Sequence, residues 1–335
     1  MAGREGVRPS TARAALPSQT PPATRTPEEA PMPDRTRQWR PGYPLDLGRT
    51  LYPLQRGTGD PAFRRDPDGT VWRASRTPDG PGTLCIRPDH DEIAATAWGP
   101  GADWLLQQLP ALLGADDDPA GLVLPPGPLR DAQRACPGLR LTRTGLIMES
   151  LVPAVLEQKV TTGEAYRAWR TLLRDHGAPA PGPAADLGMR VAPSARDWSL
   201  IPSWAWHRAG VDPKRSATVQ RAVRLAAKLE AAATMSSADA FARLTAVPGI
   251  GVWTAAETLQ RSNGDADAVS VGDFHLPNIV GWALAGRPRS DDTQMLGLLE
   301  PYRPHRHRLC RILPLTGARP PKYGPRLTPA DHRER

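Results

Sequence analysis

The short segment at residues 247–251, which joins two helical patterns, limits the possible folds more than any other part of the sequence. It reads Val-Pro-Gly-Ile-Gly, with two glycines two positions apart. Glycines at this spacing let the backbone turn tightly and approach another group without a Cβ in the way. The preceding segment carries Phe241 and Leu244 at helical spacing, and a second helical pattern follows. The sequence therefore predicts a tight hairpin between two helices.

The second helix of this hairpin is expected to start near residue 252 and to bind an anion at its start. The first turn of a helix has N–H groups without intrahelical acceptors and lies at the positive end of the helix dipole. Both properties favour a phosphate at this position. A glycine-rich turn that serves packing alone is the alternative interpretation.

Four further segments, at residues 136–141, 151–160, 209–215 and 302–306, extend the pattern in chain order. Together with Pro-Gly-Ile-Gly-Val-Trp-Thr-Ala at residues 248–255, they resemble the helix-hairpin-helix DNA glycosylase superfamily, in particular its 3-methyladenine DNA glycosylase II branch. The resemblance spans residues 136–318. It implies a mainly α fold: a helical helix-hairpin-helix glycosylase core with a small mixed α/β N-terminal domain.

The resemblance also implies what the hairpin binds. It points to DNA phosphates, and to a monovalent cation held by hairpin carbonyl oxygens; no catalytic metal and no other cofactor is expected. The hairpin residues that we expect to bind DNA are Val247, Pro248, Gly249, Ile250, Gly251 and Thr254.

The catalytic aspartate of the family corresponds to Asp273, just beyond the second hairpin helix. Cleavage of an N-glycosidic bond builds positive charge on the deoxyribose as the base departs. A carboxylate beside C1′ stabilises that charge and can orient or deprotonate the attacking water. The alternative is that Asp273 merely caps the helix that starts near Phe274, and both roles can hold together.

Two residues of the second hairpin helix are expected to line the base pocket. Trp253 occupies the position at which strand-nicking relatives carry a lysine nucleophile, and an indole cannot form a Schiff base. The sequence thus predicts an enzyme that removes a base without cutting the strand. Trp253 is expected either to stack on the everted base or to pack in the core. Glu257 stands where relatives can show an aromatic residue, and either recognises a donor-bearing base edge or faces solvent.

Three residues outside the hairpin are also expected to bind DNA. Gln158 and Lys159 lie where the family often presents a wedge that fills the gap left by the everted base. Lys159 is a less apolar plug than usual, and an ordinary surface lysine is the alternative. Arg306 belongs to a group of C-terminal arginines for which phosphate contacts and internal ion pairs are both open.

The chain divides into four predicted regions. Residues 1–42 read as a disordered Pro/Arg-rich tail, and residues 43–135 as an α/β domain. Within that domain, a β-hairpin is expected over residues 69–87 and a helix over residues 102–113. Residues 136–318 form the glycosylase core, in which Pro153 is expected in the first turn of one helix and Ser216 at the start of another. Residues 319–335 form a basic tail.

Charge and cysteine content agree with this interpretation. The formal net charge of +8 suits a polyanionic partner. The three cysteines form no CxxC pair, which argues against a disulfide scaffold or an iron–sulfur loop and favours a reducing compartment. No segment has the length and hydropathy of a membrane span. We therefore expect a monomeric protein of the cytoplasm and nucleoid, without membrane contact.

The function expected from the resemblance is that of a monofunctional DNA N-glycosylase in base excision repair. Its partner is double-stranded DNA that contains damaged bases, and its substrate is an alkylated (3-methyladenine-type) or otherwise modified base. Two alternatives remain at this level. One is a DNA-binding protein of the same fold without catalysis, and the other is a glycosylase for deaminated or oxidised bases.

Overall fold

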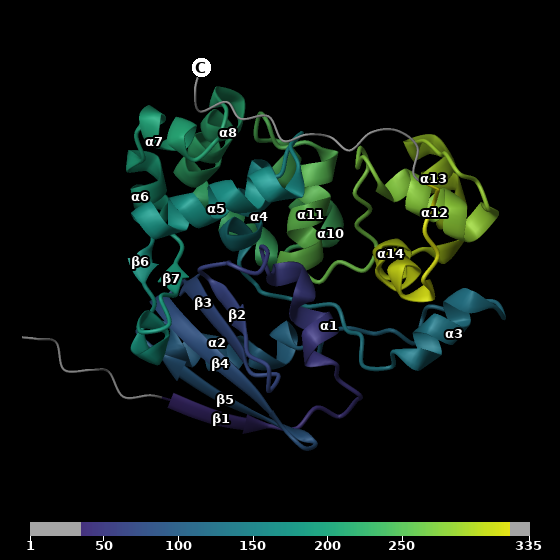
Figure 1. The fold of residues 1–335 in the computed structure, drawn as a ribbon, viewed down its shortest axis with the longest axis horizontal. Helices are drawn as coiled ribbons and strands as arrows, with labels where there is room; N and C mark the ends of the chain where they lie inside the picture. Colours follow the sequence, from purple (N-terminus) through teal and green to yellow (C-terminus); the bar gives the residue numbers. More distant parts are fainter. Residues whose placement is uncertain (1–34, 322–335) are drawn as a thin grey trace, which may run out of the picture. The chain divides into compact units, whose positions relative to one another are not determined.

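The computed structural model describes residues 35–321 of the chain (Figure 1). Most of the two predicted tails lies outside this range. The boundary of the N-terminal tail at residue 42 is wrong, because β1 (Arg35–Trp39) pairs with β5 (Glu92–Trp98). An edge strand needs backbone hydrogen bonds to one neighbour only, so the polar sequence of this segment does not prevent pairing. Trp39 also packs against the adjacent core.

The N-terminal part contains a five-stranded antiparallel sheet in the order β1-β5-β4-β3-β2. The predicted β-hairpin is confirmed: β3 (Val71–Thr77) and β4 (Gly80–Asp89) pair in a register that sets Thr77 opposite Gly80. Strand β2 (Phe63–Arg65) forms the other edge. The predicted helix is α2 (Ala102–Leu112), and its leucines are buried together with the apolar face of the sheet.

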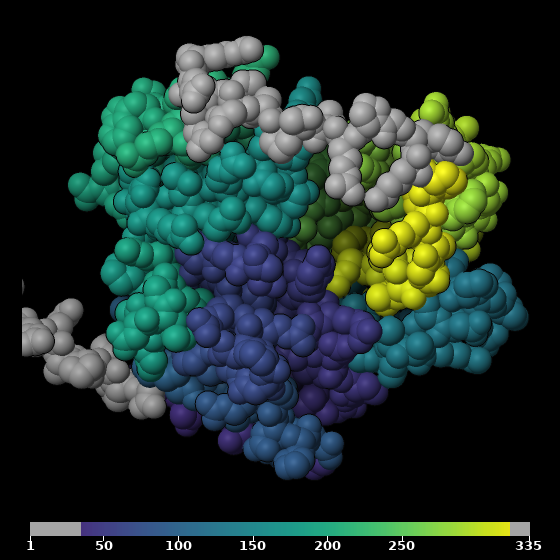
Figure 2. Space-filling view, in the orientation of Figure 1, coloured from purple at the N-terminus to yellow at the C-terminus, as the bar shows by residue number. Residues whose placement is uncertain are grey.

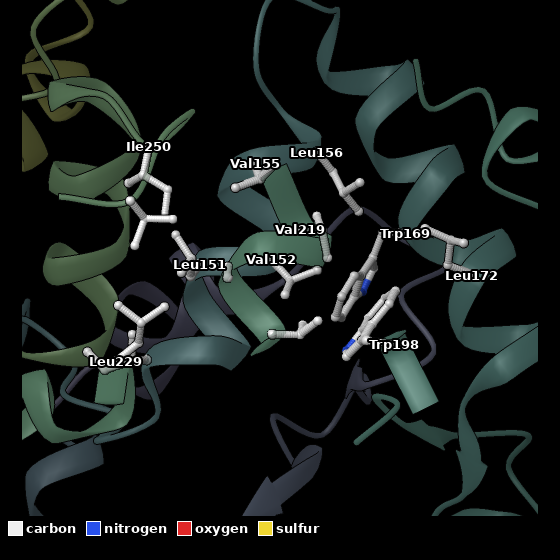
Figure 3. Packing of buried hydrophobic residues seen from close by; sticks show 14 of the residues in the cluster. Leu151, Val152, Val155, Leu156, Trp169, Leu172, Trp198, Val219, Leu229 and Ile250 are labelled. Atoms are coloured by element: carbon white, nitrogen blue, oxygen red, sulfur yellow. The ribbon is translucent and has the colours of Figure 1, made fainter. Parts of the chain in front are cut away.

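Helices on one side of the sheet form a second apolar core (Figure 1). Figure 3 shows the rings of Trp169 and Trp198 facing each other at one end of this core, with Ile250 of the predicted turn at the other end. The helices are α4 (Ile147–Leu156), α5 (Thr162–His176), α6 (Ala195–Leu200), α7 (Ser203–Arg208), α8 (Pro213–Arg224), α9 (Ala226–Glu230), α10 (Ser237–Thr245) and α11 (Val252–Ser262).

Two predicted helix starts are wrong. Pro153 lies inside α4, which starts at Ile147, and α8 starts at Pro213 rather than at Ser216. The signal for α8 was present in the sequence: the Asp212 carboxylate accepts from the N–H groups of the first turn, and proline at the first helical position lacks the N–H that would be unpaired there.

A third core lies among the C-terminal helices α12 (Leu276–Ala285), α13 (Asp292–Leu299) and α14 (Arg306–Ile312). The earlier helix α3 (Pro128–Ala135) packs here through Ala132. Residues 122–135 thus share a core with the end of the chain, although the sequence places them before the predicted glycosylase core. Whether this core and the sheet behave as separate domains stays a prediction.

The remaining elements are short. They are α1 (Leu47–Leu51), β6 (Ala178–Pro179), β7 (Arg190–Val191), and 3₁₀ turns at Tyr52–Leu54, Gly182–Ala185, Ala231–Thr234, Glu300–Tyr302 and Leu313–Thr316. Within residues 35–321, no helix is long and apolar enough to cross a bilayer.

Candidate active site at the helical hairpin

The predicted hairpin connects α10 to α11 at residues 246–251. Gly249 has φ +96°, a conformation that L side chains rarely adopt, and a Cβ there would lie 2.3 Å from the Thr218 hydroxyl oxygen of α8. Gly251 caps α11 without a side-chain hydrogen bond, and a Cβ there would meet open space. Gly249 is therefore required by the turn itself, whereas Gly251 leaves the start of α11 open to a ligand.

The predicted hairpin contacts divide between surface and core. Pro248, Gly249 and Gly251 are exposed, and the N-terminal end of α11 is exposed with them. Val247 and Ile250 bury their side chains in the helical core, and Figure 3 shows Ile250 there. These two side chains hold the turn against α4 and α11, so only their backbones remain available to a phosphate.

Gln158 and Thr254 stabilise the hairpin through side-chain hydrogen bonds. The Gln158 amide donates to the Gly249 carbonyl at 3.0 Å and to the Thr254 hydroxyl at 2.8 Å. The Thr254 side chain is buried, so it contributes to the shape of the hairpin rather than reaching DNA. Arg221 of α8, which the sequence did not single out, donates through Nε to the Pro248 carbonyl at 2.9 Å. No sequence signal links residue 221 to the hairpin, because the contact crosses two helices.

These contacts bear on the monovalent cation that the resemblance implies. Such an ion would be coordinated by hairpin carbonyl oxygens, and three of them already accept hydrogen bonds. The Val247 carbonyl accepts from the Ile250 N–H at 3.0 Å, and the next two accept from Arg221 and Gln158. One of these donors is itself a cation, so an added ion would meet a like charge. These hydrogen bonds and the nearby guanidinium make the turn a poorer donor set for a monovalent cation than one whose carbonyls are free.

Asp273 lies between the hairpin helix and the start of α12. Its Oδ1 accepts from the backbone N–H groups of His275 and Leu276, each at 2.8 Å. Its Oδ2 accepts from the indole N–H of Trp253 at 3.1 Å. The carboxylate is partly exposed. The capping role considered for Asp273 is thus present, and one carboxylate oxygen is tied to α11.

Trp253 and Glu257 occupy successive turns of α11. The Trp253 indole is half-buried and orients Asp273, a contact that neither stacking nor core packing would predict. The Glu257 carboxylate forms an ion pair with Arg261 (2.7 Å, Nη1 to Oε2) and accepts a hydrogen bond from the Ser270 hydroxyl. The alternative that Glu257 faces solvent is therefore wrong, because its side chain is largely buried and paired with Arg261. A role of either residue in a base pocket stays a prediction.

Lys159 lies in the turn between α4 and α5, next to Gln158. Its side chain is exposed and its φ is +55°, which is uncommon for a residue with a side chain. The adjacent Gln158 contacts the hairpin, so Lys159 emerges close to the hairpin surface. This placement agrees with either a wedge or a surface lysine.

Arg306 is committed to an internal ion pair, contrary to the predicted DNA contact. Its Nε and Nη2 donate to the two carboxylate oxygens of Asp267 at 2.8 and 2.7 Å, and the side chain is only 13% exposed. A bidentate pair of this kind leaves little of the guanidinium to meet a phosphate. Of the two interpretations that the sequence left open for the C-terminal arginines, the internal pair holds for Arg306.

A cluster of cationic side chains lies where α11 and α14 approach the N-terminal part. Burial, with Arg311, Arg261 and Arg308 nearby, keeps the pKa of His307 well below its ordinary value. Burial, and then the charge of Arg261, lower the pKa of Arg311 to about 10. This cluster could not be predicted from the sequence, because its members come from elements far apart in the chain.

In Figure 2, the green surface of α10 and α11 is recessed between the teal helix α5 and the yellow C-terminal helices.

Comparison with known proteins adds evidence on the fold. No protein-family model and no curated protein sequence matches the chain. A solved structure of 3-methyladenine DNA-glycosylase from Archaeoglobus fulgidus is similar with a TM-score of 0.67 and 14% identity, over 84% of this chain and 98% of that chain. The apo 8-oxoguanine glycosylase/lyase of Clostridium acetobutylicum gives 0.66 and 11%, over 86% and 98%.

The same Clostridium acetobutylicum enzyme, in complex with double-stranded DNA containing cytosine opposite 8-oxoG, gives a TM-score of 0.66 and 10% identity, over 86% of this chain and 97% of that chain. The fold of the chain is therefore that of the helix-hairpin-helix DNA glycosylases, with a mainly helical core and a small N-terminal part that carries the sheet.

Proposed function

We propose that this chain is a monofunctional DNA N-glycosylase that removes alkylated or otherwise modified bases from duplex DNA. One observation carries the proposal: the hydrogen bond from Trp253 to Asp273 ties a carboxylate to the helix that begins at the hairpin. A phosphate held at the start of α11 would thus be bound by the same helix that positions the proposed catalytic group. The fold shared with known DNA glycosylases supports the proposal.

The proposed reaction is hydrolysis of the bond between C1′ and the base nitrogen. The target nucleotide is first everted from the duplex, which costs a few kcal/mol. The bonding electrons leave with the base, and Asp273 stabilises the positive charge that develops on the sugar. The oxygen of a water molecule then bonds to C1′. Its proton is transferred to the departing base where that base leaves as an anion, and to solvent where a positively charged alkylated base leaves neutral. The products are a free base and an abasic site in an uncut strand.

The absence of strand cleavage follows from the side chain at position 253. Strand-cutting relatives use a lysine amine there to form a Schiff base, and an indole nitrogen cannot do so. The structure gives Trp253 another task, because its N–H is directed at Asp273. The product is therefore expected to be cut only after alkali or a separate endonuclease acts on it.

The substrate class is proposed more broadly than the branch that the sequence resembles. The position of an expected aromatic residue is filled by Glu257, which is paired with Arg261. An aromatic surface that attracts a cationic base is therefore reduced at this position. The two solved neighbours named above act on differently damaged bases, so the fold alone does not favour alkylation damage over oxidation.

An assay of base release tests the proposal. The protein is incubated with duplex DNA methylated by an alkylating agent, and with duplexes containing hypoxanthine, uracil or 8-oxoguanine, and free bases are identified by mass spectrometry. We expect release from at least one duplex, and Asp273→Asn should slow it by at least ~100-fold with duplex affinity within a few fold. DNA binding without release of any base would favour the non-catalytic alternative, and equal release by the Asn variant would exclude Asp273 as the catalytic group.

A further inference from the structure

We propose that Arg221 provides a permanent positive charge at the DNA-binding hairpin, so that this chain binds DNA without the monovalent cation implied for hairpins of this kind. The inference rests on the proposed function insofar as it requires the hairpin to bind DNA. It concerns one side chain and one class of ligand, the phosphate backbone.

Two carbonyl oxygens of the turn already accept hydrogen bonds from side chains. The Pro248 carbonyl accepts from Arg221 Nε at 2.9 Å, and the Gly249 carbonyl accepts from the Gln158 amide at 3.0 Å. An ion at a hairpin is held by backbone carbonyls, so each hydrogen bond donated to a carbonyl of the turn competes with an ion for that oxygen. The guanidinium already places a full positive charge at the Pro248 carbonyl, and an arginine stays protonated at any physiological pH.

A second hydrogen bond fixes the position of the Arg221 side chain. Its Nη2 donates to the Thr218 hydroxyl at 3.0 Å, and that hydroxyl donates to the Lys214 carbonyl one turn earlier in α8. The planar guanidinium is thus held on α8 by one directed hydrogen bond and reaches the hairpin through another, which a mobile ion cannot do.

The contact is possible because the backbone at Gly249 approaches α8 closely. Gly249 faces Thr218 and Arg221, because a Cβ at residue 249 would lie 2.3 Å from the Thr218 hydroxyl oxygen and 3.1 Å from Arg221 Nη2. The glycine that permits the turn therefore also admits the guanidinium to the hairpin backbone. Arg221 remains partly exposed, so its charge contributes to the surface on which the start of α11 would receive a phosphate.

Binding of a fluorescent duplex, followed by anisotropy, tests the inference. The affinity of the unmodified chain is measured at one ionic strength in potassium chloride, sodium chloride and tetramethylammonium chloride, whose cation is too large to coordinate the turn. We expect the three dissociation constants to agree within about twofold. A loss of affinity confined to tetramethylammonium would overturn the inference and leave DNA binding intact. Absence of binding in every salt would instead contradict the proposed function.

A variant locates the effect. Arg221→Met should weaken binding by about tenfold and lower the slope of log affinity against log salt by about one. Arg224→Met is the matched control: it lies on the same helix, is exposed and loses the same charge, and we expect less than a threefold change. Circular dichroism establishes that both variants fold. Equal behaviour of the two variants would show that residue 221 has no special place at the hairpin.

Discussion

At the scale of single residues, the two carboxylate oxygens of Asp273 accept hydrogen bonds from different donors. Oδ1 accepts from two backbone N–H groups at the start of α12, and Oδ2 accepts from the Trp253 indole. Capping fixes the position of the carboxylate, and the indole restricts its rotation. The proposed catalytic role and the observed capping role are therefore compatible.

The Trp253 contact predicts a defect that is specific to the chemical step. Trp253→Phe keeps an aromatic ring but removes the N–H that donates to Asp273. Because a hydrogen bond to a charged group contributes about 1.5–3 kcal/mol, we expect single-turnover base release to slow by at least about tenfold. Affinity for duplex DNA should stay unchanged, since the phosphate site is not altered. Trp204→Phe, at an exposed tryptophan, is the control, and an equal loss in both variants would contradict a positioning role.

At the scale of elements, the hairpin joins α10 to α11 and is contacted from two further helices. The end of α4 reaches it through Gln158, α8 through Arg221, and α11 begins from it. These contacts fix the turn before any ligand binds. A preformed turn lowers the entropic cost of binding, because little backbone remains to be ordered.

The two hairpin glycines should respond differently to substitution. Gly249→Ala forces a Cβ against Thr218 at a φ of +96°, so we expect the free energy of unfolding to fall by more than ~1 kcal/mol and DNA affinity to fall with it. Gly251→Ala meets no atom within 4 Å and keeps a φ of −91°, so stability should change by less than ~1 kcal/mol.

DNA affinity should nevertheless fall for Gly251→Ala, because its methyl group would stand where the phosphate is expected. Urea titrations and anisotropy separate the two effects. Full DNA affinity in the Gly251 variant would place the phosphate elsewhere.

The sequence predicted those parts of the site that depend on neighbours along the chain. The turn at residues 248–251 and helix α11 follow from glycine spacing and periodicity, and both are confirmed. Asp212-Pro213 is a local signal for the start of α8, whereas the prediction places that start three residues later, at Ser216. The partners of Glu257 and Arg306 could not be predicted, since each is supplied by a loop that only the fold brings near.

At the scale of the whole molecule, buried ion pairs join segments that are distant in sequence. Arg308 of α14 binds both carboxylate oxygens of Asp117, and both side chains are only 4% exposed. Arg73 of β3 pairs with Glu149 of α4 through one carboxylate oxygen only. These pairs connect the third core and the helical core to the N-terminal part.

Removal of one partner from the first of these pairs should be costly. Asp117→Ala leaves the Arg308 guanidinium buried without its counter-charge, so we expect the free energy of unfolding to fall by about 3–5 kcal/mol. Asp91→Ala is the control, because its pair with Arg40 is exposed and should contribute less than ~1 kcal/mol. Urea denaturation measures both. Similar small losses would show that the Asp117 pair does not hold these segments together.

The cationic cluster around His307 predicts how the stability of the fold depends on pH. Burial, with Arg311, Arg261 and Arg308 nearby, holds the pKa of His307 well below its ordinary value of 6.5. Below pH 6.5 the unfolded chain therefore binds a proton that the folded chain does not. The contribution of neutral His307 to the free energy of unfolding is therefore complete above pH 6.5. It is lost as the pH falls below 6.5, by at most about 1.4 kcal/mol per pH unit.

Unfolding in urea at pH 7.5, 6.5 and 5.5 measures this dependence. Other groups titrate over the same range, so the decisive quantity is the difference between variants. His307→Gln should reduce the loss of stability between pH 6.5 and 5.5, because the glutamine takes up no proton in either state. His90→Gln is the control at an exposed position, since the His90 side chain is 98% exposed, and should leave this loss unchanged. If the two variants lose stability equally on acidification, His307 must accept its proton in the folded state, and the cluster must be open to water.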